Sequence, residues 1–136
     1  MQTKQRYTLG KSERLKSRKA IEQLFSGGKS FAVFPFKVIY GFENWQITPL
    51  CAAFSVSKRH FKKATDRNRV KRLMREAWRL QKNTLQNELS SQQQKLSVFL
   101  IYTGNTLPDY TLLFEKTAAI LKKLQKLANE KTAAGT

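Results

Sequence analysis

The stretch TDRNRVKRLMREAWRLQK, residues 65–82, decides most of what this chain can fold into. An α-helix advances about 100° per residue, and at that spacing the stretch separates into a basic side and an apolar side. The basic side holds Asn68, Lys71, Arg72, Arg75, Arg79 and Lys82. The apolar side holds Val70, Leu73, Met74, Ala77, Trp78 and Leu80. We therefore predict a long amphipathic helix that covers a core with one side and turns its cations outward.

The ends and border of this helix carry three further signals. Thr65 or Asp66 can cap its start. Arg67 and Arg69 flank the basic side near the N-terminus, where the helix adds its own partial positive charge. Glu76 follows Arg72 by four residues, a spacing at which we expect it to hold that guanidinium.

The whole chain, and not only this helix, carries a large excess of positive charge. Twenty-six Lys and Arg against nine Asp and Glu leave a net charge of +17 on 136 residues. Residues 58–82 alone hold eleven basic and two acidic residues, which is net +9. A merely solvated helix face mixes signs, whereas this one is nearly all positive and rich in Arg, whose planar guanidinium matches phosphate. An anionic partner is therefore predicted, with nucleic acid ahead of a membrane surface.

Before the basic helix, the pattern predicts one helix and two strands. The helix starts at an N-cap, Ser17, and ends at Gly27-Gly28. A strand over residues 31–40 places Phe34, Phe36, Val38 and Tyr40 on one face, with Pro35 suggesting a sheet edge or a late start. A second strand covers residues 50–57, and residues 45–48 offer a short additional one.

After the basic helix, polar residues 87–95 indicate a linker, and residues 96–103 predict an apolar strand covered on both faces. Asp109 can cap a last helix. Its apolar stripe is Leu113, Thr117, Ile120, Leu121, Leu124 and Leu127. The order α-β-β-(β)-α-β-α predicts an α/β fold of the α+β sandwich type, in which helices pack on a small mixed sheet of three to four strands.

Domain organisation and chemistry follow from the remaining residues. We expect a basic, loosely ordered arm over residues 1–14, one domain over 15–130 and a frayed tail over 131–136. A single cysteine, Cys51, in an apolar run predicts a buried thiol and a reducing compartment. No secretory signal and no run of about 18 apolar residues is present, which favours a cytoplasmic protein.

The sequence shows no catalytic constellation. His60 is the only histidine, and no glycine-rich phosphate loop, carboxylate pair or metal-ligand cluster accompanies it. We therefore assign no catalytic residue, no metal ligand and no cofactor to this chain.

Three segments together resemble the bacterial ribonuclease P protein component. They are Phe54–Arg59 (FSVSKR), Arg67–Arg72 (RNRVKR) and Arg75-Glu76 with Arg79. Weaker similarity covers nearly the whole chain. The resemblance implies an RNA-binding subunit of an endoribonuclease: the protein joins a catalytic RNA that, with Mg²⁺, cleaves precursor tRNA at its mature 5′ end by phosphodiester hydrolysis. It also implies a left-handed β-α-β crossover, which no sequence rule would predict.

The resemblance further implies which residues bind RNA. The expected contacts with the catalytic RNA are Lys58, Arg59, Arg67, Asn68, Arg69, Lys71, Arg72, Arg75 and Arg79. The expected lining of a cleft for the single-stranded 5′ leader, between the first helix and the sheet, is Ile21, Phe25, Ser30, Lys37 and Ile39. It implies a monomeric protein in a one-to-one complex with the RNA, without DNA or membrane partners.

Two other classes share part of these signals. A structural ribosomal protein would have similar charge and size, and a DNA-binding module would also carry basic helices. The Arg-Asn-Arg, Lys-Arg and Arg-Glu pattern favours the ribonuclease P interpretation over both, and neither a helix-turn-helix nor a zinc signature supports DNA binding.

Overall fold

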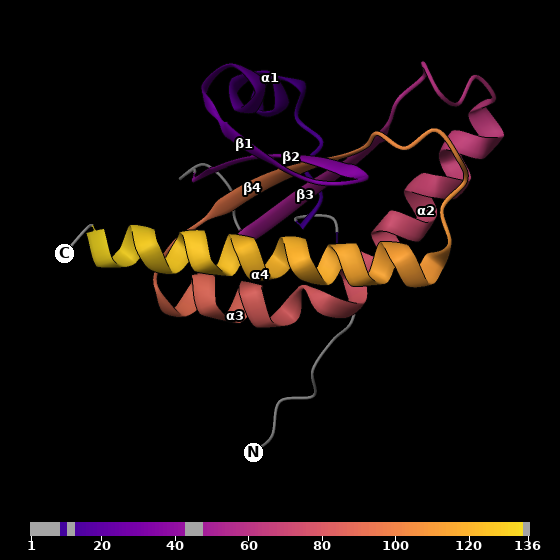
Figure 1. The fold of residues 1–136 in the computed structure, drawn as a ribbon. Helices are drawn as coiled ribbons and strands as arrows, with labels where there is room; N and C mark the ends of the chain where they lie inside the picture. Colours follow the sequence, from indigo (N-terminus) through magenta and orange to yellow (C-terminus); the bar gives the residue numbers. More distant parts are fainter. Residues whose placement is uncertain (1–8, 11–12, 43–47, 135–136) are drawn as a thin grey trace.

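The computed structural model describes residues 9–10, 13–42 and 48–134. Figure 1 shows a sheet with helices on both of its faces. In chain order the elements are α1 (Arg18–Gly27), β1 (Lys29–Val33), β2 (Phe36–Phe42), β3 (Leu50–Val56), α2 (Ala64–Gln81), α3 (Asn83–Ser91), β4 (Leu96–Tyr102) and α4 (Tyr110–Ala134).

The four strands form one mixed sheet in the order β1-β2-β4-β3. β2 pairs antiparallel with both β1 and β4, whereas β3 runs parallel to β4. β4 is an internal strand, as its apolar run predicts. The α+β sandwich is therefore confirmed, and α2 and α3 lie in the crossover between the parallel strands; the hand of that crossover stays a prediction.

The two faces of the sheet are covered unequally. α2, α3 and α4 pack on one face and enclose the main core, in which Val38, Met74 and Leu124 are among the most buried side chains. α1 lies on the opposite face (Figure 1) over a smaller core built on Leu24, Ile39 and Cys51. Around it Ala53, Phe99 and Ile101 remain only partly buried. One face is thus closed, and the other keeps an accessible apolar margin.

The single strand predicted over residues 31–40 is wrong. β1 and β2 form a hairpin whose turn is Phe34-Pro35. Pro35 has no N–H to donate to a neighbouring strand, so a continuous strand is interrupted here. Its carbonyl accepts a hydrogen bond from Thr103 N at 2.7 Å. Phe36, Val38 and Tyr40 share a buried face as predicted, but Phe34 leaves that face and is 76% exposed.

The linker predicted over residues 87–95 is also wrong over much of its length. Residues 83–91 form α3, and its two buried residues, Leu85 and Leu89, lie four positions apart on one side. Tertiary packing of this narrow stripe outweighs the low helical preference of the surrounding Asn and Ser residues.

The observed helix ends match only some of the ends and caps that the sequence predicts. Ser17 caps α1, because its hydroxyl accepts a hydrogen bond from Ala20 N. The cap predicted for α2 is wrong: Lys63 occupies that position, without a side-chain cap bond. α4 follows Asp109 as expected and continues to Ala134, past the end expected for the domain. Of residues 45–48, only Thr48 lies inside the described part of the chain, at a bend.

Cys51 is buried, as predicted, with its sulfur 3.4 Å from the Thr48 hydroxyl. Burial raises the pKa of this thiol, so the unreactive protonated form is favoured. Among the described helices, none combines the length and hydropathy needed to cross a membrane.

Candidate nucleic-acid interface

The basic side of α2 faces outward because its apolar side packs against α4 and the sheet. Val70, Met74 and Trp78 are buried in the main core. The opposite side presents Asn68, Arg69, Arg72 and Arg75, which are exposed or partly exposed, and Lys71, which is half-buried. A hollow of about 430 Å³ is lined by Thr65, Asn68, Arg69, Arg72 and Arg75. The structure therefore brings four of the predicted RNA-contacting residues around one concave, strongly cationic surface.

A second groove, of about 660 Å³, runs beside the first along the β3 edge. Arg72 and Arg75 line both concavities. The rest of its lining is Leu9, Arg14, Leu15, Lys16, Ala52, Ala53, Phe54, Glu76 and Arg79. Arg14 and Lys16 were not among the predicted site residues, because nothing in the local sequence shows that this segment reaches α2.

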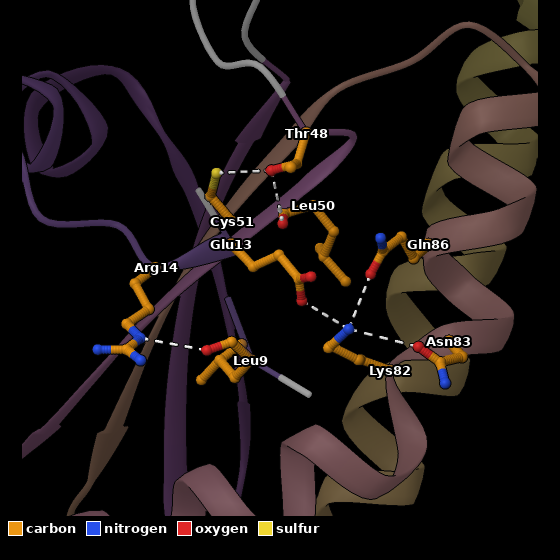
Figure 2. Close-up of polar contacts among 9 residues, drawn as sticks. All are labelled: Leu9, Glu13, Arg14, Thr48, Leu50, Cys51, Lys82, Asn83 and Gln86. Carbon is orange, nitrogen blue, oxygen red and sulfur yellow. Dashed lines mark hydrogen bonds and ion pairs between the residues drawn. The ribbon is translucent and has the colours of Figure 1, made fainter. Parts of the chain in front are cut away.

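Backbone hydrogen bonds and a buried ion pair place that segment. Leu15 N donates to Ala52 O at 2.8 Å, and Arg14 forms a parallel bridge with Ala52. Glu13 Oε2 lies 2.6 Å from Lys82 Nζ (Figure 2). The wall that carries Arg14 and Lys16 is thus fixed both to β3 and to the junction of α2 with α3.

Lys82 corrects the helical-wheel prediction. Its side chain is 2% exposed and turns inward instead of joining the basic side of α2. Besides facing Glu13, its ammonium donates to Gln86 Oε1 at 3.0 Å and Asn83 Oδ1 at 3.3 Å (Figure 2). Lys82 follows the last residue of α2, so the regular periodicity of that helix no longer governs its direction.

Glu76 also differs from expectation, since it holds Arg79 and not Arg72. Arg79 donates to Glu76 through Nη2 at 2.5 Å and Nε at 3.2 Å. This hydrogen bonding lowers the pKa of the Glu76 carboxyl, and the positive charge of Arg79 adds to the effect. The single acid on the basic side therefore offsets Arg79 and leaves the hollow at Arg69, Arg72 and Arg75 cationic.

Three more predicted residues lie at the start of α2 and in the loop before it: Arg67 in the helix, and Lys58 and Arg59 in the loop. Arg67 Nη1 donates to the carbonyls of Phe61 at 2.7 Å and Lys62 at 2.9 Å. Phe61 is buried, whereas Arg59 is exposed and Lys58 lies at the surface beside it. Part of the Arg67 guanidinium is thus used to hold the loop in place.

The residues predicted to line a leader cleft come together on the α1 face of the sheet. Ser30 pairs with Ile39, and Lys37 pairs with Ile101, so these side chains share that face. Phe25 is 49% exposed, and its ring centroid lies 5.0 Å from that of Phe99. Ile39 is mostly buried beneath α1, where it acts chiefly as core.

A close backbone approach holds α1 against this face. A Cβ atom placed on Gly28 would collide with Leu24 O and would stand 2.9 Å from Tyr40 O. Only glycine fits here, so α1 can pass directly into β1 beside β2.

The described residues contain no group of three or more His, Cys, Asp and Glu side chains arranged to hold a metal ion. His60 lies exposed in the loop before α2.

A four-stranded mixed sheet with a cationic helix in its parallel crossover defines a small, basic α+β sandwich protein. The family model for ribonuclease P matches residues 9–125. The chain therefore belongs to the ribonuclease P protein family, the family of the protein subunit of a tRNA-processing endoribonuclease.

Curated relatives agree with this assignment, and a solved structure shares the fold. The ribonuclease P protein component of Porphyromonas gingivalis W83 is 40% identical over 106 residues, covering 76% of this chain and 77% of its own length. That of Chlorobaculum tepidum is 37% identical over 86 residues, covering 60% and 56%. The fold is similar to the ribonuclease P protein of Thermotoga maritima, with a TM-score of 0.65 at 24% identity, covering 82% of this chain and 96% of that one.

Proposed function

We propose that this chain is the RNA-binding protein subunit of a ribonuclease P ribonucleoprotein and binds both the catalytic RNA and the 5′ leader of precursor tRNA. The observation that carries the proposal is the cationic hollow on α2, lined by Asn68, Arg69, Arg72 and Arg75. Guanidinium groups around a concave surface are well placed to bind phosphate, because each can form paired, charge-assisted hydrogen bonds with the phosphate oxygens.

The leader is assigned to the open α1 face of the sheet. A binder of single strands that tolerates many sequences needs cations for phosphates and apolar or aromatic surfaces for bases. Lys37 supplies a cation there, and the exposed part of Phe25 supplies an aromatic edge beside Phe99. Ser30 adds a hydroxyl on the same face. Ile21, which belongs to α1, packs against the small core beneath the helix, and Ile39 of β2 is part of that core.

Hydrolysis is assigned to the RNA partner, which requires Mg²⁺ for this chemistry. The described residues of the protein offer charge and shape, and its role in the proposal is to bind, orient and neutralise. Screening of closely packed phosphates by this surface lets the RNA fold and bind substrate at lower Mg²⁺. We propose a one-to-one complex of a monomeric protein with the RNA in the cytoplasm.

The test is cleavage of precursor tRNA by a bacterial ribonuclease P RNA at Mg²⁺ too low for the RNA to work well alone. Adding the protein is expected to raise kcat/KM for this cleavage. When an unrelated structured RNA replaces the ribonuclease P RNA, the precursor tRNA should not be cleaved. As a control for loss of positive charge away from α2, a protein with Lys122 and Lys126 of α4 replaced by Ala should stimulate cleavage like wild type. No stimulation by the wild-type protein would contradict the proposed function.

A further inference from the structure

Phe34 is the most exposed of the large apolar side chains that the structure describes, at 76%. An isolated exposed apolar residue is ordinary in a soluble protein and carries no meaning by itself. The surroundings of Phe34 make it a candidate contact residue, because hydrogen bonds hold the turn that presents the ring and a cationic loop lies at the same end of the sheet.

The turn itself has little freedom. The carbonyl of Pro35 accepts two hydrogen bonds from Thr103, from its backbone N at 2.7 Å and its hydroxyl at 2.9 Å. Val33 and Phe36 close the hairpin as a register pair immediately behind the turn. A ring presented on a fixed turn loses less conformational entropy on binding than one on a mobile loop.

Tyr102 joins this turn to the two neighbouring loops. Its ring centroid lies 5.9 Å from that of Phe36 and 6.0 Å from that of Phe61, in the loop before α2. Its hydroxyl donates to Thr106 O at 2.8 Å, in the loop after β4. Tyr102 O also accepts a hydrogen bond from Ser57 N. The hairpin turn and both loops therefore form one surface at the end of the sheet that Figure 1 shows towards the start of α2.

The chemistry of this end suits an unpaired nucleotide. The loop before α2 carries four cations at the surface, Lys58, Arg59, Lys62 and Lys63. Leu107 is 48% exposed in the loop after β4. Lys37, on the open α1 face, directly follows Phe36 of the closing pair. The end surface thus continues the face assigned to the leader and combines an aromatic ring with flanking cations.

We propose that Phe34 is a stacking platform for an unpaired base of the 5′ leader, at the point where that strand passes Lys37, with Lys58 and Arg59 beside its phosphates. The proposal rests on the proposed function and adds to it a contact residue outside the predicted cleft. An apolar ring among cations could also bind an anionic lipid surface. The RNA strand is favoured because Phe34 lies next to the face that carries Lys37, which is the face assigned to the leader.

The test compares three variants in the complex with the catalytic RNA. Phe34→Ala is expected to weaken binding of leader-bearing precursor tRNA by about tenfold, the usual order for losing one stacked base. Binding of the same tRNA without a leader should not change. Phe34→Trp should keep wild-type affinity. Phe114→Ala, which truncates another exposed ring on α4, should behave like wild type for both RNAs.

The outcomes separate this inference from the function on which it rests. If the wild-type protein does not assemble with the RNA, the proposed function fails and this inference fails with it. If wild type assembles and prefers the leader-bearing substrate while Phe34→Ala keeps that full preference, only the inference is overturned. An equal loss for both substrates would place Phe34 against another part of the RNA and overturn it too. Wild-type binding to phosphatidylserine vesicles that Phe34→Ala abolishes, with both RNA affinities unchanged, would assign the ring to lipid and overturn the stacking role.

Discussion

At the scale of single residues, Lys82 is the clearest departure from the helical wheel: it was predicted at the surface, but it is buried and holds two segments together. Taking an ammonium group out of water costs several kcal/mol unless the protein supplies partners. Here Glu13 supplies the opposite charge, and Asn83 and Gln86 supply acceptor oxygens. The result is a polar clamp between the segment before α1 and the α2–α3 junction.

Replacing Lys82 with Met should destabilise the fold, because the substitution leaves the carboxylate of Glu13 largely buried without its cation. We expect the free energy of unfolding to fall by about 3 kcal/mol, measured by urea denaturation. Lys126→Met on the exposed side of α4 is the control and should change stability by less than about 0.5 kcal/mol.

The double variant Lys82→Met, Glu13→Leu isolates the charge effect. Removing both partners leaves no unpaired buried charge, so stability should recover in part relative to Lys82→Met alone. Equal losses of stability in the single and double variants would show that the ion pair contributes nothing beyond packing.

At the scale of elements, α2 has one side committed to the core and one to solvent, so its cations can be altered without disturbing the sheet. The triple variant Arg69→Ala, Arg72→Ala, Arg75→Ala should bind the catalytic RNA more weakly. The plot of log affinity against log salt should become shallower by about 0.7–0.9 for each phosphate that the variant no longer neutralises. Arg67 is left in place because its guanidinium holds the loop at Phe61.

The measurement is a salt titration of RNA binding, compared with a triple variant in which Lys116, Lys122 and Lys126 of α4 become Ala. Both variants lack three positive charges of the wild type, so a difference in slope reports direct binding of phosphate and not net charge. An identical slope for wild type and the α2 variant would remove these arginines from the interface.

The features that could be predicted from the sequence are those that depend on regular periodicity within one helix or strand. The two sides of α2, the internal position of β4 and the apolar stripe of α4 all follow from spacing within one element. The α3 helix was missed because only Leu85 and Leu89 mark it within a polar stretch. The hairpin was missed because Phe34 and Phe36 bracket Pro35 with apolar residues that suggest one continuous strand.

The candidate site was predictable to the same extent. Asn68, Arg69, Arg72 and Arg75 belong to one helix, so their shared hollow follows from periodicity. Arg14 and Lys16 join the adjoining groove only because their segment is bound to β3 and to Lys82. Such interactions join residues distant in sequence, and no local pattern records them.

At the scale of the whole molecule, the net charge of +17 works against compactness, since like charges repel within one small domain. Any anion that binds the folded chain better than the unfolded chain stabilises it by mass action. The cationic hollow on α2 provides such a preference, because its arginines converge only when the helix is packed.

Thermal unfolding should therefore depend on which anion is present. At constant ionic strength, replacing chloride with sulfate or phosphate should raise Tm by about 5 °C, provided the anion is in large excess over its dissociation constant. The α2 triple variant should lose most of that increase, whereas the α4 triple variant should keep it. Equal increases in both variants would indicate a general salt effect and no binding at the hollow.

The parallel pairing of β3 with β4 also has a consequence for the order in which the molecule can assemble. The crossover between them spans residues 57–95, so the cationic helix is synthesised before the strand on which the central sheet depends. Until residues 96–102 leave the ribosome, β2 and β3 have no shared neighbour, and α2 lacks much of its apolar seat. Pairing across so long a separation is slow to form. Until residues 96–102 are available, the nascent chain is therefore a highly charged, incompletely packed segment, and binding of an anionic partner would stabilise it.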